Sequence, residues 1–312
     1  DNPGDGDYVA FFQNLDRLFA TFHAPRFDLY VGRQAIAWGS AKAVNPTDII
    51  APFLYNEIDI EDRIGVDAAR LRVPAGSLGE VDVGYVAGKD FEWKESAVFA
   101  RGKFYALKTD MTVLTMAFRE NLLAGIDVTR SIGGAGAWCE AAYVWARAFE
   151  DLDKPVDEND YLRLSAGADY NFGAGVYTFL EYHYNGAGAS DPHDYLVNIV
   201  SNPTAYADGA VYLFGRHYLI PGVVWQATAL TSVSGQVLAN LDDFSCLVAP
   251  LVQYNATENL YLSAGGYLAL GDNPTAVVLP ASMAGGDAVI PTFNSEFGAY
   301  PSELYLFLNY YY

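Results

Sequence analysis

The sequence has 312 residues, a formal net charge of −20 and 18% charged residues, fewer than the roughly 25% of a typical soluble domain. Its 38 acidic against 18 basic residues exclude a nucleic-acid-binding surface, which needs clustered Lys and Arg. No uninterrupted apolar run approaches the roughly 18 residues that a membrane helix needs, so helical membrane spans are excluded too. The high content of Tyr, Gly, Val and Leu instead favours strands and turns.

Apolar and polar residues alternate along most of the chain, which is the period-two pattern of a β-strand. In residues 79–88, Val81 and Val83 share one face while Glu80 and Asp82 share the other. The same pattern predicts fifteen strands, at residues 8–22, 27–38, 64–73, 79–88, 96–108, 111–119, 121–131, 135–147, 160–171, 174–184, 213–227, 231–241, 244–255, 258–270 and 302–312.

The connections between these strands alternate in kind. Tight turns alternate with connections that are often long, notably 39–63, 148–159, 185–212 and 271–301. Short turns at one rim, longer loops at the other and strands of about ten residues are typical of outer-membrane barrels. We therefore predict a single all-β domain over residues 1–312, a transmembrane antiparallel up-and-down β-barrel with its long loops extracellular. A soluble sandwich or propeller also has period two, but charged residues in mid-strand fit a water-filled lumen better.

The strand count is odd, whereas bacterial single-chain barrels have an even number. Either one strand is miscounted or an upstream strand is missing. We favour the second and predict about 16 strands, because the opening DNPGDGD looks like a loop. The aromatic residue that ends the last strand resembles the C-terminal signal that the outer-membrane assembly machinery recognises.

The segment GRQAIAWGSAKAVNPTDIIAPF, residues 32–53, resembles a motif of porin-like outer-membrane barrels of Gram-negative bacteria. In that motif a strand ending in GRQ-x-I-x-WG leads into an NP-x-D loop, and LANLDD at 238–243 looks like the same type of protein. The resemblance implies an outer-membrane location among lipid and lipopolysaccharide. It leaves the cargo open, since related barrels are described as porins, exporters and sheaths for electron-transfer cytochromes.

The same segment has a physical interpretation of its own. Trp38 is expected where a strand leaves the lipid, a normal interfacial place for Trp. Asn45, Pro46 and Asp48 form a turn-prone, capping-competent stretch. This stretch either folds inward as a short helix or plug, or is a structural rim loop.

Charged side chains on the polar face are the candidate pore lining. Opposed basic and acidic walls would set a field across a pore and filter solutes by charge. The alternative is that they pair across neighbouring strands and fill a narrow barrel. The candidates are Arg17, Arg70, Arg72, Arg101, Lys103, Arg163, Glu80, Asp82, Glu140, Asp169 and Glu181.

Other chemistry has weaker support in the sequence. Acidic runs at 56–62 and 150–160 could bind Ca²⁺ through carboxylate oxygens, or they are solvated loops; the candidate ligands are Asp59, Glu61, Asp62, Asp153 and Asp157. No G-x-S-x-G and no C-x-x-C-H occurs, so we expect no enzyme and no haem or other cofactor bound by this chain.

Three functions follow from this pattern. The leading hypothesis is an outer-membrane channel for passive passage of small polar or cationic solutes. The second is a barrel sheath of a transmembrane electron conduit, in which a multihaem cytochrome partner carries the haem. The third is an adhesin or anchor with a packed lumen, and whether the chain forms a homo-oligomer is open.

Overall fold

A computed structural model describes residues 15–50, 65–149, 159–209, 211–279 and 288–310. Fifteen strands form one sheet in which each strand pairs antiparallel with its neighbour along the chain, an up-and-down order. The strands are β1 (Leu18–Ala24), β2 (Phe27–Gln34), β3 (Val66–Ala75), β4 (Gly79–Val86), β5 (Ala97–Ala106), β6 (Thr109–Phe118), β7 (Asn121–Ile132), β8 (Ala135–Trp145), β9 (Tyr161–Gly173), β10 (Val176–Asn185), β11 (His217–Gln226), β12 (Thr231–Asn240), β13 (Cys246–Thr257), β14 (Leu260–Leu270) and β17 (Glu303–Tyr310).

All fifteen predicted strands are confirmed, with shifts of a few residues at their ends. The first part of the first predicted strand, residues 8–14, lies outside the described residues. The long connection 271–301 also contains a hairpin that the alternation does not predict, formed by β15 (Thr275–Leu279) and β16 (Ala288–Thr292). Apolar and polar residues do not alternate there, because the strands TAVVL and AVIPT are only five residues long and mostly apolar. No helix among the described residues is long and apolar enough to cross a membrane.

The two faces of the sheet differ in polarity, as the alternation predicts. On β4, Val81 and Val83 are 43% and 36% exposed, whereas Asp82 between them is 1% exposed. On β17, Leu304 and Leu306 are more than 80% exposed. We call the apolar exposed face the outer face and the opposite face the inner face. An exposed apolar face that runs along a whole sheet requires an apolar surrounding or partner.

The sheet has two end strands, β1 and β17. Because neighbours are antiparallel and the strands number fifteen, β1 and β17 run in the same direction. One further antiparallel strand between them would give an even count. The predicted sixteenth strand therefore stays a prediction.

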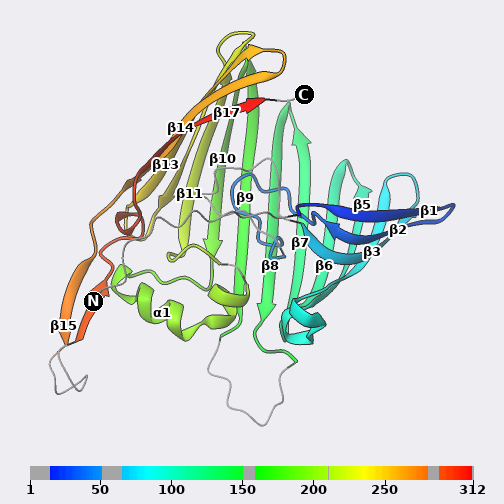
Figure 1. Cartoon of the computed structure of the whole chain (residues 1–312), viewed down its shortest axis with the longest axis horizontal. Helices are drawn as coiled ribbons and strands as arrows, with labels where there is room; N and C mark the ends of the chain where they lie inside the picture. Colours follow the sequence, from blue (N-terminus) through cyan, green and yellow to red (C-terminus); the bar gives the residue numbers. More distant parts are fainter. Residues whose placement is uncertain (1–14, 51–64, 150–158, 210, 280–287, 311–312) are drawn as a thin grey trace, which may run out of the picture.

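Several connections pack against the inner face. The segment of residues 35–50, which follows β2 and which we call the inner segment, crosses in front of β8 and β9 (Figure 1). The short helix α1 (Tyr195–Ser201) and the turns η3 (Pro192–Asp194), η4 (Thr204–Asp208) and η5 (Phe297–Ala299) lie in the long connections. Two apolar clusters fill the space between these connections and the sheet. Part of the interior is therefore packed rather than open.

Candidate functional site

Glu140 on β8 holds the inner segment against the sheet. Its side chain is fully buried and accepts five hydrogen bonds. The backbone N–H groups of Ser40 and Ala41 donate to Oε2 at 3.1 and 3.2 Å, and the Asn45 amide donates to the same oxygen at 3.1 Å. The N–H and hydroxyl of Thr47 donate to Oε1 at 2.9 and 2.7 Å. A buried carboxylate is stable only when its oxygens are satisfied in this way.

Glu181 on β10 holds the next stretch of the same segment. Its carboxylate accepts from three successive N–H groups, those of Lys42 at 2.7 Å, Ala43 at 3.3 Å and Val44 at 3.0 Å. The indole N–H of Trp138 donates to it at 2.9 Å. Successive N–H groups that converge on one anion are a recurrent way to bind negative charge. The inner segment is therefore attached to the wall by two buried carboxylates.

Gly39 allows the inner segment to approach Glu140 so closely. Its φ is +97°, in the left-handed region that favours glycine. A Cβ at this position would overlap the Glu140 carboxylate and the Asn45 amide. Any other residue would therefore push the segment away from the wall.

The turn predicted at Asn45, Pro46 and Asp48 faces inward. Pro46 and Asp48 are buried, and the Asp48 N–H donates to the Asn45 carbonyl at 3.2 Å, which forms a turn rather than a helix. Residues 51–64 lie outside the described part of the chain. The expectation that Trp38 lies at the lipid boundary is wrong. Its side chain is 6% exposed and lies on the inner face, where it packs edge-on against Phe99 with the ring centroids 4.7 Å apart.

A third buried carboxylate, Glu296, joins the long connections at the other flank. It accepts from the N–H groups of Phe214 at 3.0 Å and Gly215 at 3.4 Å, and from the Asn240 amide at 2.8 Å. The Tyr218 hydroxyl also donates to it. Burial, reinforced by the charge of nearby Asp243, raises the pKa of Glu296 from its ordinary value of 4.5 to about 7.

This raised pKa predicts a pH-dependent stability. Since Glu296 binds its proton more tightly when folded, its contribution is complete below pH 4.5 and is lost as the pH rises through 7. The free energy of unfolding should fall by up to about 3 kcal/mol across this window. Urea unfolding in detergent micelles at pH 5 and pH 8.5 measures the change. Glu296→Gln, which cannot titrate, should remove this component, whereas the exposed Glu303→Gln should retain it; equal pH dependence in all three proteins would contradict the prediction.

Five of the predicted charged residues pair across neighbouring strands. Asp82 on β4 accepts from the Arg70 guanidinium on β3, and Arg72 Nε lies 3.6 Å from Asp82 Oδ2. Arg101 on β5 lies 3.7 Å from the Glu80 carboxylate. In this part of the sheet the charges form a cross-strand network, the alternative that the sequence left open, rather than opposed walls.

Ser165 and His183 meet on β9 and β10, a contact that the sequence analysis did not predict. Both are buried, and Ser165 Oγ lies 2.8 Å from His183 Nδ1. The Ser165 hydroxyl donates its proton to the Val44 carbonyl at 2.6 Å, so His183 must donate to Ser165. A hydrolase needs the opposite polarity, with the imidazole accepting the hydroxyl proton. The contact therefore serves to hold the inner segment.

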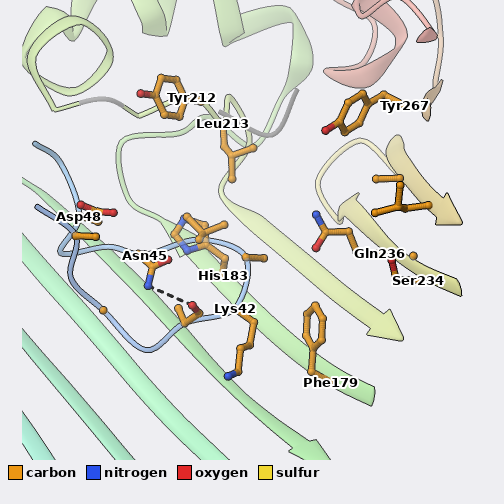
Figure 2. A pocket seen from close by; sticks show the side chains of 18 of the residues that line it. Lys42, Asn45, Asp48, Phe179, His183, Tyr212, Leu213, Ser234, Gln236 and Tyr267 are labelled. Atoms are coloured by element: carbon orange, nitrogen blue, oxygen red, sulfur yellow. Dashed lines mark hydrogen bonds between the residues drawn. The ribbon is translucent and has the colours of Figure 1, made fainter. Parts of the chain in front are cut away.

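A cavity of about 580 Å³ lies between the inner segment and the flank formed by β10 to β14 and β17. Figure 2 shows Asn45, Asp48 and His183 on one side of it and Ser234, Gln236 and Tyr267 on the other. Its basic lining residues are Lys42 and Arg163. The lining also includes aromatic rings, so a solute in this cavity would meet both charge and apolar surface.

Comparison with solved structures identifies the fold. The chain is similar to OccK11 (OpdR) of Pseudomonas aeruginosa, with a TM-score of 0.52 and 10% identity over 81% of this chain and 75% of that chain. The fold is that of the porin barrels. OprD of the same organism has a TM-score of 0.47 at 10% identity, covering 90% of this chain and 77% of its own. A variant of a Rh. blastica porin has a TM-score of 0.44 at 12% identity, covering 80% and 82%. No protein-family model and no curated protein matches the sequence.

In this porin-like fold the remaining predicted pore-lining residues lie in three environments. Asp169 accepts from the Tyr177 hydroxyl at 2.9 Å and the Gly136 N–H at 3.0 Å, and Lys42 Nζ lies 3.8 Å from it. Arg17 and Lys103 are exposed. Glu140 and Glu181 face inward and are covered by the inner segment, and Arg163 lines the cavity. The role of the whole set in selectivity stays a prediction.

The proposed calcium ligands lie in segments outside the described residues. Asp59, Glu61 and Asp62 fall within 51–64, and Asp153 and Asp157 fall within 150–158. Among the residues that the structure does describe, no group of three His, Cys, Asp or Glu side chains is placed to hold a metal ion. Calcium binding stays a prediction.

Proposed function

We propose that the protein is a porin-like channel of the Gram-negative outer membrane through which small polar solutes pass passively. Its barrel would be embedded in lipid and in contact with lipopolysaccharide, and the assembly machinery would recognise its last strand. The GRQ-x-I-x-WG and NP-x-D motif is then the part of the sequence that forms the strand end and the inner segment. The long connections would face the outside of the cell.

One observation carries this proposal: a sheet with an apolar exposed outer face bears charged side chains and a folded-in segment on its inner face. A water-filled lumen accommodates such an interior, whereas a soluble sandwich would have to bury it. The inner segment narrows the interior without filling it, since a cavity of about 580 Å³ remains beside it. This arrangement supports a narrow, selective pore. The net charge of −20 adds the expectation that the mouth enriches cations.

Conductance tests the proposal. The purified chain, reconstituted in planar bilayers, should give discrete current steps, and the reversal potential in a KCl gradient gives the sign of its selectivity. Because the inner segment lies against β8 and β10, the current steps of the wild type should be smaller than those of a variant in which this segment is released. Absence of current from correctly folded, heat-modifiable protein would overturn the channel.

The same preparation distinguishes the other hypotheses. A barrel sheath for a multihaem cytochrome should copurify from native membranes with a haem-staining partner and conduct poorly by itself. An anchor with a packed lumen should give neither haem nor current. The described interior favours the channel over the sheath, because the inner segment occupies the space beside β8 and β10 that a cytochrome would enter.

A further inference from the structure

Residues 211–216, which we call the covering segment, form part of the cavity wall just before β11 begins. Val211, Tyr212 and Leu213 belong to the lining, and Figure 2 shows Leu213 at the top of the cavity with Phe179 on the opposite side. The covering segment belongs to no helix or strand, so its position depends on the contacts of a few residues. The width of the cavity therefore depends on what holds this segment in place.

Side chains from two distant parts of the chain hold the covering segment. The Asn185 amide on β10 donates to the carbonyls of Leu213 and Gly215 at 2.7 and 3.1 Å. The carboxyl group of Glu296, which is fully buried, accepts from the N–H groups of Phe214 at 3.0 Å and Gly215 at 3.4 Å. An amide does not titrate, whereas a carboxyl group does. The attachment through Glu296 can therefore respond to pH.

Glu296 shares its surroundings with a second carboxylate, that of Asp243 in the turn between β12 and β13. The Glu296 N–H donates to Asp243 Oδ2 at 2.7 Å, and the Asn240 amide nitrogen lies 3.1 Å from that oxygen and 2.8 Å from Glu296 Oε2. The same nitrogen lies 3.0 Å from the Tyr195 hydroxyl. Since an amide group has two hydrogens, it serves these three acceptors incompletely. One donor thus bridges the two carboxyl groups without satisfying both at all times.

The other titratable groups around Glu296 are tyrosine hydroxyls, which are neutral near pH 7. They are Tyr218 on β11, Tyr195 on α1, Tyr206 in η4 and Tyr300 after η5. Of the charged neighbours of the covering segment, Asp242 accepts from the Arg216 N–H at 2.6 Å, and Arg216 Nε donates to the Gly188 carbonyl at 2.7 Å. The donors described above for Glu296 and Asp243 are all neutral. Ionisation of Glu296 therefore adds a second negative charge that its hydrogen-bond donors do not neutralise.

We propose that the covering segment is a pH-dependent gate over the cavity, held closed while the Asp243–Glu296 pair carries one negative charge and loosened when Glu296 ionises. The inference rests on the proposed channel function, because it gives the pore a second, wider state. In the closed state the pKa of Glu296 is about 7. A proton is bound more tightly in this state than in an opened one where the carboxyl group meets water, so protons favour closure and a pH rising through 7 favours opening.

Hydrogen exchange of the whole chain in detergent micelles tests the gate without requiring transport. Protection factors, corrected for the intrinsic pH dependence of amide exchange, are compared at pH 5.5 and pH 8.5 on peptides covering residues 211–216. Protection in the wild type should fall about thirtyfold, the difference that a pKa of about 7 when closed and 4.5 when opened gives between these pH values. Glu296→Gln, which cannot ionise, should show no fall, whereas the exposed Glu303→Gln should behave like the wild type.

Removing the neighbouring charge tests the carboxylate pair itself. In Asp243→Asn the midpoint of the protection loss should move to lower pH, because Glu296 then ionises beside a neutral amide. Wild-type current steps in planar bilayers should grow from pH 5.5 to pH 8.5, and those of Glu296→Gln should not.

Three results would overturn the gate. They are equal wild-type protection of residues 211–216 at both pH values, the same loss of protection in Glu296→Gln, and an unchanged midpoint in Asp243→Asn. A protein that conducts but whose protection does not change with pH contradicts only this inference. One whose protection changes as expected but which carries no current contradicts only the channel.

Discussion

Replacing Glu140 by alanine is expected to release the inner segment from the sheet. The substitution removes an acceptor of five hydrogen bonds. It takes this partner from the buried donors of Thr47 and from the half-buried N–H groups of Ser40 and Ala41. Each hydrogen bond to a charged group contributes about 1.5 to 3 kcal/mol, and these contributions are not additive. We expect the free energy of local opening of the segment to fall by about 4 kcal/mol, which is roughly a thousandfold faster amide exchange.

Hydrogen exchange read by mass spectrometry on peptides covering residues 39–48 measures this change. Current steps in planar bilayers should become larger at the same time, because the segment no longer narrows the interior. Glu303→Ala, an exposed acidic residue on β17, controls for the loss of one negative charge and should change neither quantity. Unchanged protection of residues 39–48 in Glu140→Ala would show that Glu181 and the apolar contacts of the segment suffice to hold it.

The strands could be predicted because each is specified by its own residues. Period two is a local signal, and a strand that divides lipid from water repeats it over about ten residues. The hairpin of β15 and β16 was not predicted, because a mostly apolar stretch of five residues lacks the alternation that distinguishes a strand from other apolar segments. Inward orientation of Glu140, Glu181 and Arg163 followed from strand parity alone.

The partners of those inward residues could not be predicted. Glu140 meets donors that lie 93 to 100 positions earlier in the chain, and no local pattern reports such a contact. A charged residue on the polar face of a strand gives the same local sequence pattern whether its side chain contacts water, an arginine or a folded-in loop. The sequence contains one indication that the inner segment folds inward. Gly39 is followed closely by Asn45-Pro46, and this flexible, turn-prone stretch allows the chain to turn inward without requiring it.

The surroundings of Arg163 depend on three strands at once. Its neighbours across the sheet are set by the registers of β8, β9 and β10, and their hydrogen bonds are set by connections far along the chain. Arg70 shows the opposite outcome for the same residue type on the same face, because its cross-strand surroundings place Asp82 within reach. Sequence parity identifies both arginines as inward but does not predict that Arg70 meets an aspartate on the neighbouring strand.

That contrast makes Asp82 the position where loss of one carboxylate should cost the fold most. Asp82 and Arg70 are 1% and 5% exposed, and Arg72 shares the same carboxylate. Asp82→Ala would leave the Arg70 guanidinium buried without a counterion, which lowers the free energy of unfolding by about 3 to 5 kcal/mol. Urea unfolding in micelles, followed by tryptophan fluorescence, measures the loss.

Two further variants separate burial of the charge from loss of the contact. Asp67→Ala removes the partner of Arg33 in a pair where the aspartate side chain is 61% exposed, so it should cost less than about 1 kcal/mol. Arg70→Met combined with Asp82→Leu removes both charges and should recover most of the stability lost in Asp82→Ala, because no buried ion then lacks a partner. If the double variant is as unstable as Asp82→Ala, the loss comes from packing around β3 and β4, and the unpaired guanidinium is not its cause.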